Sequence, residues 1–174
     1  MSSAPPLSMK LLNSMNKTGF TTALGFAFEL SPWVVERAWD ERPFDSVEGL
    51  HAGMMAVLEA ASTADKLALI RAHPELAGKA AIAKTLTAES NAEQASAGLD
   101  KLTAEEFERF HALNAAYAER FGFPHIIAVR LNDKTSILAA MQARLSNDET
   151  QEIAEAITQI GHISRLRLFD AVSA

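Results

Sequence analysis

The feature of this sequence that most constrains its fold is a long series of helix start and stop signals, with almost no strand pattern between them. Leu102-Thr103-Ala104-Glu105-Glu106-Phe107 is the strongest signal, because Thr103 and Glu106 can form a capping box while Leu102 and Phe107 form a hydrophobic staple. Further helix starts are predicted at Ser31-Pro32, Asp45-Ser46, Ser62-Thr63 and Ser146-Asn147-Asp148-Glu149, and stops at Arg42-Pro43, His73-Pro74, Gly98 and Gly122. Such a series favours helices packed on helices over an α/β fold, which needs alternating strands.

Hydrophobic spacing supports the same fold class. Apolar residues recur at steps of three and four at Val47, Leu50, Met54, Val57, Leu58 and Ala61, as on the buried face of an amphipathic helix. Residues 125–131 resemble a strand, but a lone strand leaves its backbone groups without partners, so we expect buried irregular chain or the start of a helix there. We predict an all-α protein, a single-domain irregular bundle of roughly seven to eight helices.

Length and composition indicate the domain organisation. With 174 residues, 48% of them hydrophobic, the chain can bury one sizeable core. Residues 1–8 contain two prolines and three serines and are expected to form a flexible N-terminal arm, which leaves residues 9–174 as the helical domain. Neither a secretory signal nor an apolar run of the roughly 18 residues that span a membrane is recognisable, so we expect a cytoplasmic location without membrane partners.

Charge and residue usage argue against several classes of function. A net charge of -6 disfavours nucleic acid as a partner, and the absence of cysteine excludes disulfides, thiolate metal sites and cysteine nucleophiles. The five histidines, at positions 51, 73, 111, 125 and 162, are not spaced as pairs of metal ligands on a helix, so no metal site is expected. Helical surroundings favour an ordinary surface or core-edge position for His51, His111 and His162.

His73 and a polar helix further along the chain are the strongest candidates for chemistry. Pro74 fixes the chain at a helix end, which would hold the imidazole of His73 where it can exchange a proton near pH 7. The alternative is a purely structural turn. Ser90, Glu93 and Gln94 lie at helical steps of three and four, so one face carries a hydroxyl, a carboxylate and an amide beside small residues. That face could hold a polar heterocycle, with Glu93 orienting His73, or it could be a solvated helix face.

Two further segments could complete a binding site. Phe121-Gly122-Phe123-Pro124 ends a helix, and the segment 125–129 after it could present backbone N–H and C=O groups to an amide-rich ligand or serve as core filling. Near the C-terminus, Arg167 lies at helical spacing from apolar residues, namely Ile153, Ile157 and Ile160. This spacing places Arg167 on a core-facing stripe, where an arginine needs an anionic partner.

Four strings, taken in order, resemble the family of 2-oxo-4-hydroxy-4-carboxy-5-ureidoimidazoline (OHCU) decarboxylases. They are HPELAGK at 73–79, LTAESNAEQASAGLDKL at 86–102, FHALNAAYAERFGFPHIIAVR at 110–130 and RLRLFDAV at 165–172. The resemblance covers nearly the whole chain. It implies an all-helical fold, decarboxylation of OHCU to (S)-allantoin in urate degradation, no cofactor, and a homodimer.

The resemblance also implies roles for individual residues. His73 would be the catalytic acid or base with Glu93 as its partner, and Arg167, or in another register Arg165, would contact the substrate. The other substrate contacts would come from Pro74, Ser90, Asn91, Ala92, Glu93, Gln94, His125, Ile126, Ile127, Ala128 and Val129. The family usually has Phe-Gly-Phe-Pro-Phe where this chain ends in His125, which would give the pocket a second titratable group.

Two other functions are compatible with these residues. A non-catalytic helical module could hold a purine-derived ureide in the same place and would saturate with ligand without turnover. A related decarboxylase or hydratase could act on another ureide, because the face formed by Ser90, Glu93 and Gln94 favours an amide-rich ring without specifying which one.

Overall fold

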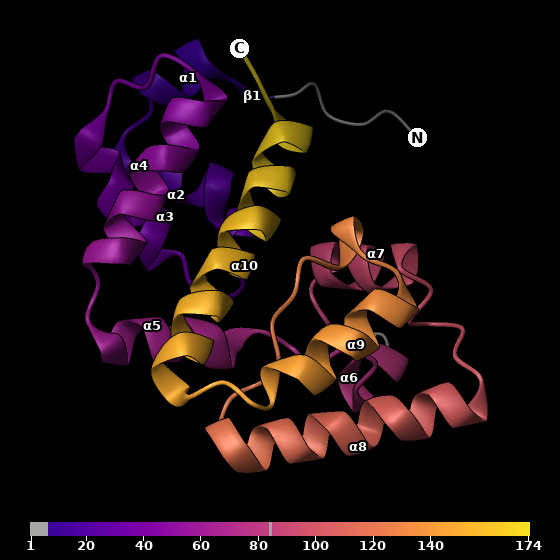
Figure 1. The fold of residues 1–174 in the computed structure, drawn as a ribbon. Helices are drawn as coiled ribbons and strands as arrows, with labels where there is room; N and C mark the ends of the chain where they lie inside the picture. The colour runs from indigo at the N-terminus through magenta and orange to yellow at the C-terminus, as the bar shows by residue number, and fades with distance from the viewer. Residues whose placement is uncertain (1–6, 84) are drawn as a thin grey trace. The chain divides into compact units, whose positions relative to one another are not determined.

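The computed structural model describes residues 7–83 and 85–174, apart from the side chains of Ala80 and Ile82. This part of the chain is almost entirely helical (Figure 1), which confirms the all-α prediction. Its α-helices are α1 (Met9–Ser14), α2 (Lys17–Leu24), α3 (Trp33–Ala38), α4 (Val47–Ala60), α5 (Thr63–Ala72), α6 (Lys79–Ile82), α7 (Ala88–Ser96), α8 (Ala104–Phe121), α9 (Lys134–Arg144) and α10 (Glu149–Ala171). Seven of these ten described helices have eight or more residues, in agreement with the predicted seven to eight. The other three are short, such as α1 with 6 residues, and offer few periodic positions.

Short elements complete the described chain. Three 3-10 helices are η1 (Gly25–Ala27), η2 (Trp39–Glu41) and η3 (Val129–Leu131). Two short strands, β1 (Leu7–Ser8) and β2 (Val172–Ser173), pair in parallel with Leu7 opposite Val172. Residues 1–6 of the expected flexible arm lie outside the described residues, so the arm stays a prediction.

Most predicted helix starts are confirmed by hydrogen bonds. The hydroxyl of Ser46 accepts a bond of 3.0 Å from the backbone N–H of Gly49 at the start of α4. At α8, the Thr103 hydroxyl accepts from the Glu106 N–H at 3.1 Å, and the Glu106 carboxylate accepts from the Thr103 N–H at 2.9 Å. This reciprocal pair is the predicted capping box. As expected, α5 ends one residue before His73, and Gly122 ends α8 at a positive φ of 72°.

Two predicted starts are wrong in detail. The box at the start of α10 does not use Ser146. Instead, the Asp148 carboxylate accepts from the Gln151 N–H at 2.8 Å, and the Gln151 side chain accepts from the Asp148 N–H at 3.0 Å. Aspartate accepts such a bond as well as serine does, and its position sets the first turn two residues later. Helix α3 begins after Pro32 without a side-chain cap.

The chain forms two compact units. Unit 1 consists of the residues up to Asp65 together with Gly161–Ala174, and unit 2 consists of Lys66–Ile160. Helices α5 and α10 each cross the boundary, so α10 contributes residues 149–160 to unit 2 and residues 161–171 to unit 1.

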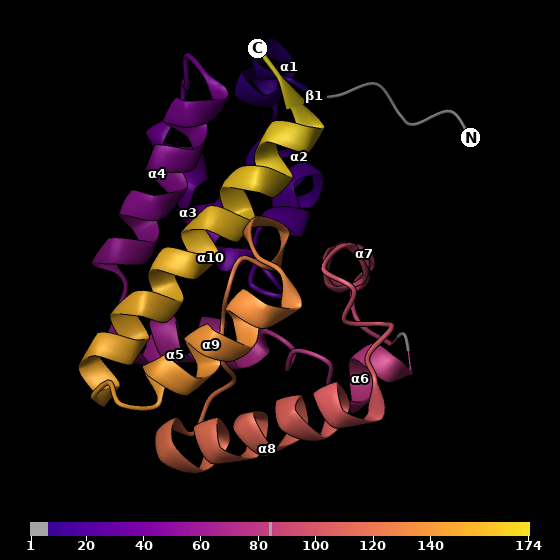
Figure 2. The ribbon, with the colours of Figure 1, turned by 45° about the vertical axis from the view of Figure 1, so that its right-hand side comes forward.

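In unit 1, helix α3 packs against both α2 and α4 (Figure 2). The predicted apolar stripe of α4 faces this packing, because Leu50, Met54 and Leu58 are fully buried. Other buried side chains of the unit include Phe20, Leu24, Phe28, Val34, Val35 and Leu168. Their burial supplies the apolar area that stabilises the unit.

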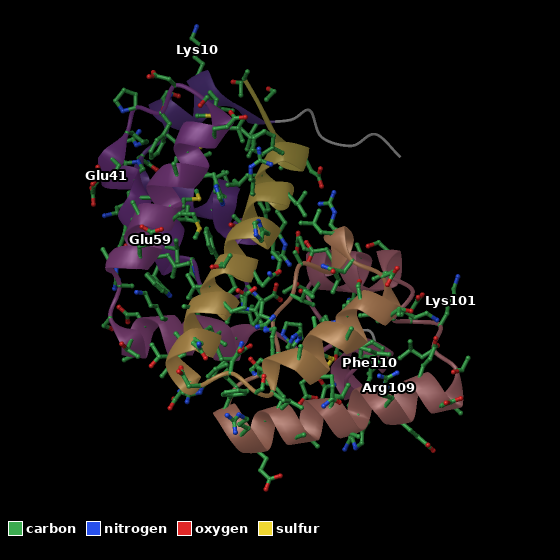
Figure 3. All side chains as sticks on the ribbon, in the orientation of Figure 1. Lys10, Glu41, Glu59, Lys101, Arg109 and Phe110 are labelled. Atoms are coloured by element: carbon green, nitrogen blue, oxygen red, sulfur yellow. The ribbon has the colours of Figure 1, made fainter. Side chains whose placement is uncertain are left out.

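Unit 2 has its own apolar cluster, formed by Leu76, Ala77, Leu99, Phe110, Leu113, Ile127, Val129, Ile137, Leu138 and Met141. The neighbours Arg109 and Phe110, labelled in Figure 3, illustrate the two sides of α8, since Arg109 is exposed and Phe110 is fully buried. Among the helices described, none is both long enough and apolar enough to cross a membrane.

Candidate functional site

His73 occupies the predicted place at the exit of α5. Its side chain is only 8% exposed, and its Nδ1 lies 2.9 Å from the backbone carbonyl oxygen of Leu69. A carbonyl oxygen can only accept a hydrogen bond, so Nδ1 must carry the hydrogen. Fixing the proton on one nitrogen makes the other, Nε2, the atom that gains and loses a proton.

The loop after this histidine is held by two buried amide side chains. The Gln94 Oε1 accepts from the Ala77 N–H at 2.9 Å, and its Nε2 donates to the Glu75 carbonyl at 3.2 Å. The Asn114 Nδ2 donates to the Leu76 carbonyl at 2.8 Å. These bonds keep Ala77 at a φ of 52°, a left-handed conformation that is rare for a residue with a side chain. Such strain persists only where the surrounding contacts enforce it, so we infer that these hydrogen bonds determine the conformation of the loop.

The polar face of α7 is not simply solvated. Ser90 and Gln94 are each only 5% exposed, and Glu93 is half-buried. Gln94, predicted to bind substrate, also contacts the loop at Glu75 and Ala77. The interpretation of this face as an ordinary solvated surface is therefore wrong.

Beside this loop, unit 2 contains a cavity of about 570 Å³. Three predicted substrate-binding residues, Asn91, Ala92 and Gln94, line it. The rest of the described lining consists of alanines, including Ala77, and of the larger residues Leu99, Asp100, Leu102 and Phe107. Ala88, Asn91, Ala92 and Ala95 form its α7 wall, which is a different face of the helix from that of Ser90 and Glu93. His73 and Pro74 are not among its described lining residues.

Residues 125–129 form the predicted buried irregular segment, and all five are buried. Side chains hold its backbone. The Ile126 carbonyl accepts a bond of 2.6 Å from Arg144 Nη1, and the Ala128 N–H donates to Gln159 Oε1 at 3.0 Å. The Ala128 carbonyl accepts from Asn132 Nδ2 at 2.9 Å.

Arg167 is buried in unit 1, as its position on the core-facing stripe predicts. It is 5% exposed, and its Nη1 donates to Glu29 Oε2 at 3.2 Å and to the Phe26 carbonyl at 3.0 Å. Arg165 is exposed and stacks over the ring of Phe169 at 4.3 Å. The interior arginine is thus Arg167, and it belongs to unit 1, whereas the other predicted site residues belong to unit 2.

Comparison with known proteins assigns the chain to a family. The sequence profile described as OHCU decarboxylase matches residues 13–169, which is most of the chain. The chain belongs to the OHCU decarboxylase family. This confirms the resemblance found in the four sequence strings.

Named relatives support the assignment. A 2-oxo-4-hydroxy-4-carboxy-5-ureidoimidazoline decarboxylase of Haloferax volcanii is 40% identical over 168 residues, covering 97% of this chain and 98% of the relative. The enzyme of the same name from Halalkalicoccus jeotgali is also 40% identical, covering 93% of this chain and 90% of the relative.

Solved structures share the fold. A crystal structure of (S)-allantoin synthase matches with a TM-score of 0.77 at 30% identity, covering 95% of this chain and 54% of that one. An OHCU decarboxylase determined in the presence of (S)-allantoin matches with a TM-score of 0.68 at 18% identity, covering 90% of this chain and 97% of that one. At that identity the second match shows the fold alone.

One polar cluster of this OHCU decarboxylase family member was not predicted from the sequence. Glu152 is fully buried, and its Oε1 accepts bonds from the Tyr117 hydroxyl and from Arg144 Nε, the latter at 2.7 Å. Its Oε2 accepts from Asn147 Nδ2 at 2.9 Å. Burial and the neighbouring Glu152 carboxylate raise the pKa of Tyr117, so its hydroxyl stays protonated and donates.

His125, where the family usually has phenylalanine, behaves as a core residue. It is 2% exposed, its ring lies edge-on to Tyr117 at 5.2 Å, and neither ring nitrogen has a partner among the described residues. Burial, and secondarily the positive charge of Arg144, lowers the pKa of His125 to about 3. The prediction of a second group that titrates in the pocket is therefore wrong near neutral pH, because the ring stays neutral.

In the described part of the chain, no group of three or more histidine, aspartate or glutamate side chains is placed to hold a metal ion.

Proposed function

We propose that this protein converts OHCU to (S)-allantoin and carbon dioxide. The observation that carries the proposal is the near full-length match, at 40% identity, to relatives named as OHCU decarboxylases. The buried His73, whose Nδ1 proton is fixed by Leu69, supplies a group suited to the required proton transfer.

The substrate itself provides the electron sink for this reaction. As the bond to the carboxylate breaks, its electron pair forms a carbon–carbon double bond, and the π pair of the adjacent ring C=N moves to nitrogen, which takes a proton. The resulting enol gives up its hydroxyl proton while the carbon that bears the ureido group gains one. The net change is loss of carbon dioxide and gain of one proton, so the proposed reaction needs no cofactor.

The stereochemistry depends on which face of the enol receives the proton. In our proposal Nε2 of His73 delivers it, since Nδ1 is occupied by the Leu69 carbonyl. Glu93, half-buried on α7, orients the imidazole in this proposal. General acid catalysis of this kind contributes about 10² to 10⁴ to a rate.

The remaining predicted residues bind the polar ring in this proposal. Arg167 supplies a guanidinium for the carboxylate or a ring oxygen, and the backbone of residues 125–129 supplies amide contacts. Pro74 frames the ligand, while Ser90, Asn91, Ala92 and Gln94 provide the wall from α7.

Circular dichroism of freshly generated OHCU tests the proposal. With the protein present, we expect rapid appearance of one allantoin enantiomer and release of carbon dioxide. Slow racemic decay at the same rate with and without protein would refute it, and saturable binding of (S)-allantoin without turnover would indicate a binding module instead. The His73→Ala variant should fold normally and lose about 10² to 10⁴ in rate, whereas His111→Ala, an exposed histidine on α8, should keep full turnover.

We also propose that the protein acts as a homodimer in the cytoplasm. The family resemblance supports the dimer, and the absence of cysteine is compatible with a reducing compartment. Light scattering coupled to size-exclusion chromatography would give a mass near twice 18.8 kDa for a dimer.

A further inference from the structure

The irregular segment 125–129 depends on side chains for its shape. Unlike a strand, it has no neighbouring ladder among the described residues, and a backbone that lacks such a ladder must find other partners. Two of its residues are held by side chains from α9 and α10: Arg144 binds the carbonyl of Ile126, and Gln159 binds the N–H of Ala128. Ile127 therefore lies between two residues whose backbone groups are fixed by hydrogen bonds with side chains.

The hydrogen bond from Arg144 to the Ile126 carbonyl belongs to a buried polar cluster that also includes Glu152 and the hydroxyl of Tyr117. Tyr117, Arg144 and Glu152 are 1%, 9% and 0% exposed, and they come from three different helices of unit 2, α8, α9 and α10. Arg144 places Nε on Glu152 and Nη1 on the Ile126 carbonyl, so one planar guanidinium joins the carboxylate to the segment.

Stability alone is a weak reason for such a cluster. Removing two charges from water is costly, and apolar residues of similar size often stabilise a core as well or better. The contact that apolar residues could not replace is the bond to the Ile126 carbonyl, because only a donor can satisfy it.

We propose that Arg144, held by Glu152 and Tyr117, is a positioning residue that fixes the substrate-binding backbone of residues 126–129. This inference rests on the proposed function, in which that backbone contacts the ureidoimidazoline ring. A displacement of about 1 Å at a binding group can cost about a hundredfold in rate, so a second layer that holds the backbone matters to catalysis although it does not touch substrate.

A triple apolar variant, Tyr117→Phe with Arg144→Met and Glu152→Leu, separates positioning from stability. It removes every charge of the cluster together, so its thermal midpoint should fall by less than that of Glu152→Ala, with the unpaired Ile126 carbonyl as the remaining cost. Because the Ile126 carbonyl then lacks its donor, KM for OHCU and Kd for (S)-allantoin should both rise, by about tenfold to a hundredfold. Amide hydrogen exchange of residues 126–129 should quicken as well.

A second variant covers the case in which the triple variant does not fold. Arg144→Lys keeps a cation for Glu152, but a single ammonium cannot reproduce the planar fork that spans the carboxylate and the carbonyl. It should fold, and it should show the same rise in KM and Kd. The matched control is Lys134→Met, which removes the partner of Glu106 from the same helix as Arg144 and should leave KM and Kd unchanged.

The outcomes are distinct. Wild-type KM, Kd and amide exchange in a folded triple variant, or in Arg144→Lys, would overturn the positioning role and leave the proposed function intact. Absence of turnover by the wild-type protein would instead refute the proposed function. In that case (S)-allantoin titration and amide exchange would still report whether Arg144 fixes the segment.

Discussion

Among the described residues, each unit buries one arginine against one glutamate, and the two pairs differ in what they connect. In unit 2, Arg144 and Glu152 are eight residues apart and lie 2.7 Å from each other through Nε. In unit 1, Arg167 and Glu29 are 138 residues apart and lie 3.2 Å from each other through Nη1. The first pair fastens two consecutive helices to a nearby loop, whereas the second ties the last helix to the first quarter of the chain.

This difference suggests different uses for the same chemistry. Arg144 divides its nitrogens between a carboxylate and the carbonyl of Ile126, so it acts on the protein's own backbone. Arg167 donates from Nη1 to both Glu29 and the Phe26 carbonyl, and we propose it as the arginine that contacts substrate. We expect removal of one partner from the first pair to lower stability in addition to weakening binding, and a conservative substitution of Arg167 to change catalysis with little effect on folding.

The largest effect is expected from Glu152→Ala. This variant leaves Arg144 buried without its counter-charge and removes the acceptor of Tyr117, so the free energy of unfolding should fall by about 3–5 kcal/mol. Urea denaturation measures this change. A loss no greater than that of the surface variant Lys134→Met would show that the cluster is not a structural anchor.

Arg167→Lys should affect catalysis rather than folding. Lysine keeps the charge but loses the fork geometry, so kcat/KM should fall by about tenfold to a hundredfold, equivalent to about 1.5–3 kcal/mol. The control is Arg165→Lys, two residues earlier, where the side chain is exposed and stacked on Phe169. If both variants lost the same activity, the assignment of Arg167 over Arg165 would fail.

His125→Phe should stabilise the protein by about 1 kcal/mol at pH 7. The substitution removes two buried nitrogens that lack partners among the described residues, and leaving such groups unsatisfied is costly. It also gives the segment the residue that the family usually has. Thermal unfolding at pH 7 would measure the gain, and a lower midpoint would indicate that the site cannot accommodate the larger ring.

The gain from His125→Phe should grow as the pH falls. The pKa of His125 is lowered from 6.5 to about 3 in the folded protein, so between these values the unfolded chain binds a proton that the folded one does not. Wild-type stability therefore decreases as pH falls through this window, by at most about 1.4 kcal/mol per pH unit from this group. His125→Phe should lack that component, which unfolding measured at pH 7, 6 and 5 would reveal.

The smallest effect is expected from Lys134→Met. The pair it forms with Glu106 is partly exposed, and pairs in contact with water contribute little. Its unfolding midpoint should match the wild type within experimental error. A clear decrease in the midpoint would mean that this partly exposed ion pair contributes to stability as buried ion pairs do. The contrast between exposed and buried ion pairs would then not hold for this protein.

Much of the fold followed from local sequence signals, because caps and stops depend on a few neighbouring residues. The Thr103–Glu106 box and the helix end before His73 are examples. The cap of α10 was misplaced by two residues, since Ser146 and Asp148 are both good caps and only packing decides between them.

The candidate site was predictable only in part. The burial of Arg167 followed from its place on an apolar stripe, but Glu29 could not be identified, since nothing local marks a partner 138 residues away. The cluster around Glu152 left a signal that was missed: Arg144 follows Ile137 and Met141 on the apolar stripe of α9, and a charge on such a stripe indicates a buried partner.

The division of α10 between the units has a consequence for biosynthesis. Unit 2 is one continuous stretch, Lys66–Ile160, whereas unit 1 needs residues 161–174 to be complete. The ribosome therefore synthesises all of unit 2 before the segment that carries Arg167, so Glu29 can pair with Arg167 only after residues 66–160 have been made. A chain that is truncated before residue 161 would keep the sequence of unit 2 intact but lack Arg167. In such a chain the carboxylate of Glu29 would be without this partner, and we expect protein quality control to act on it.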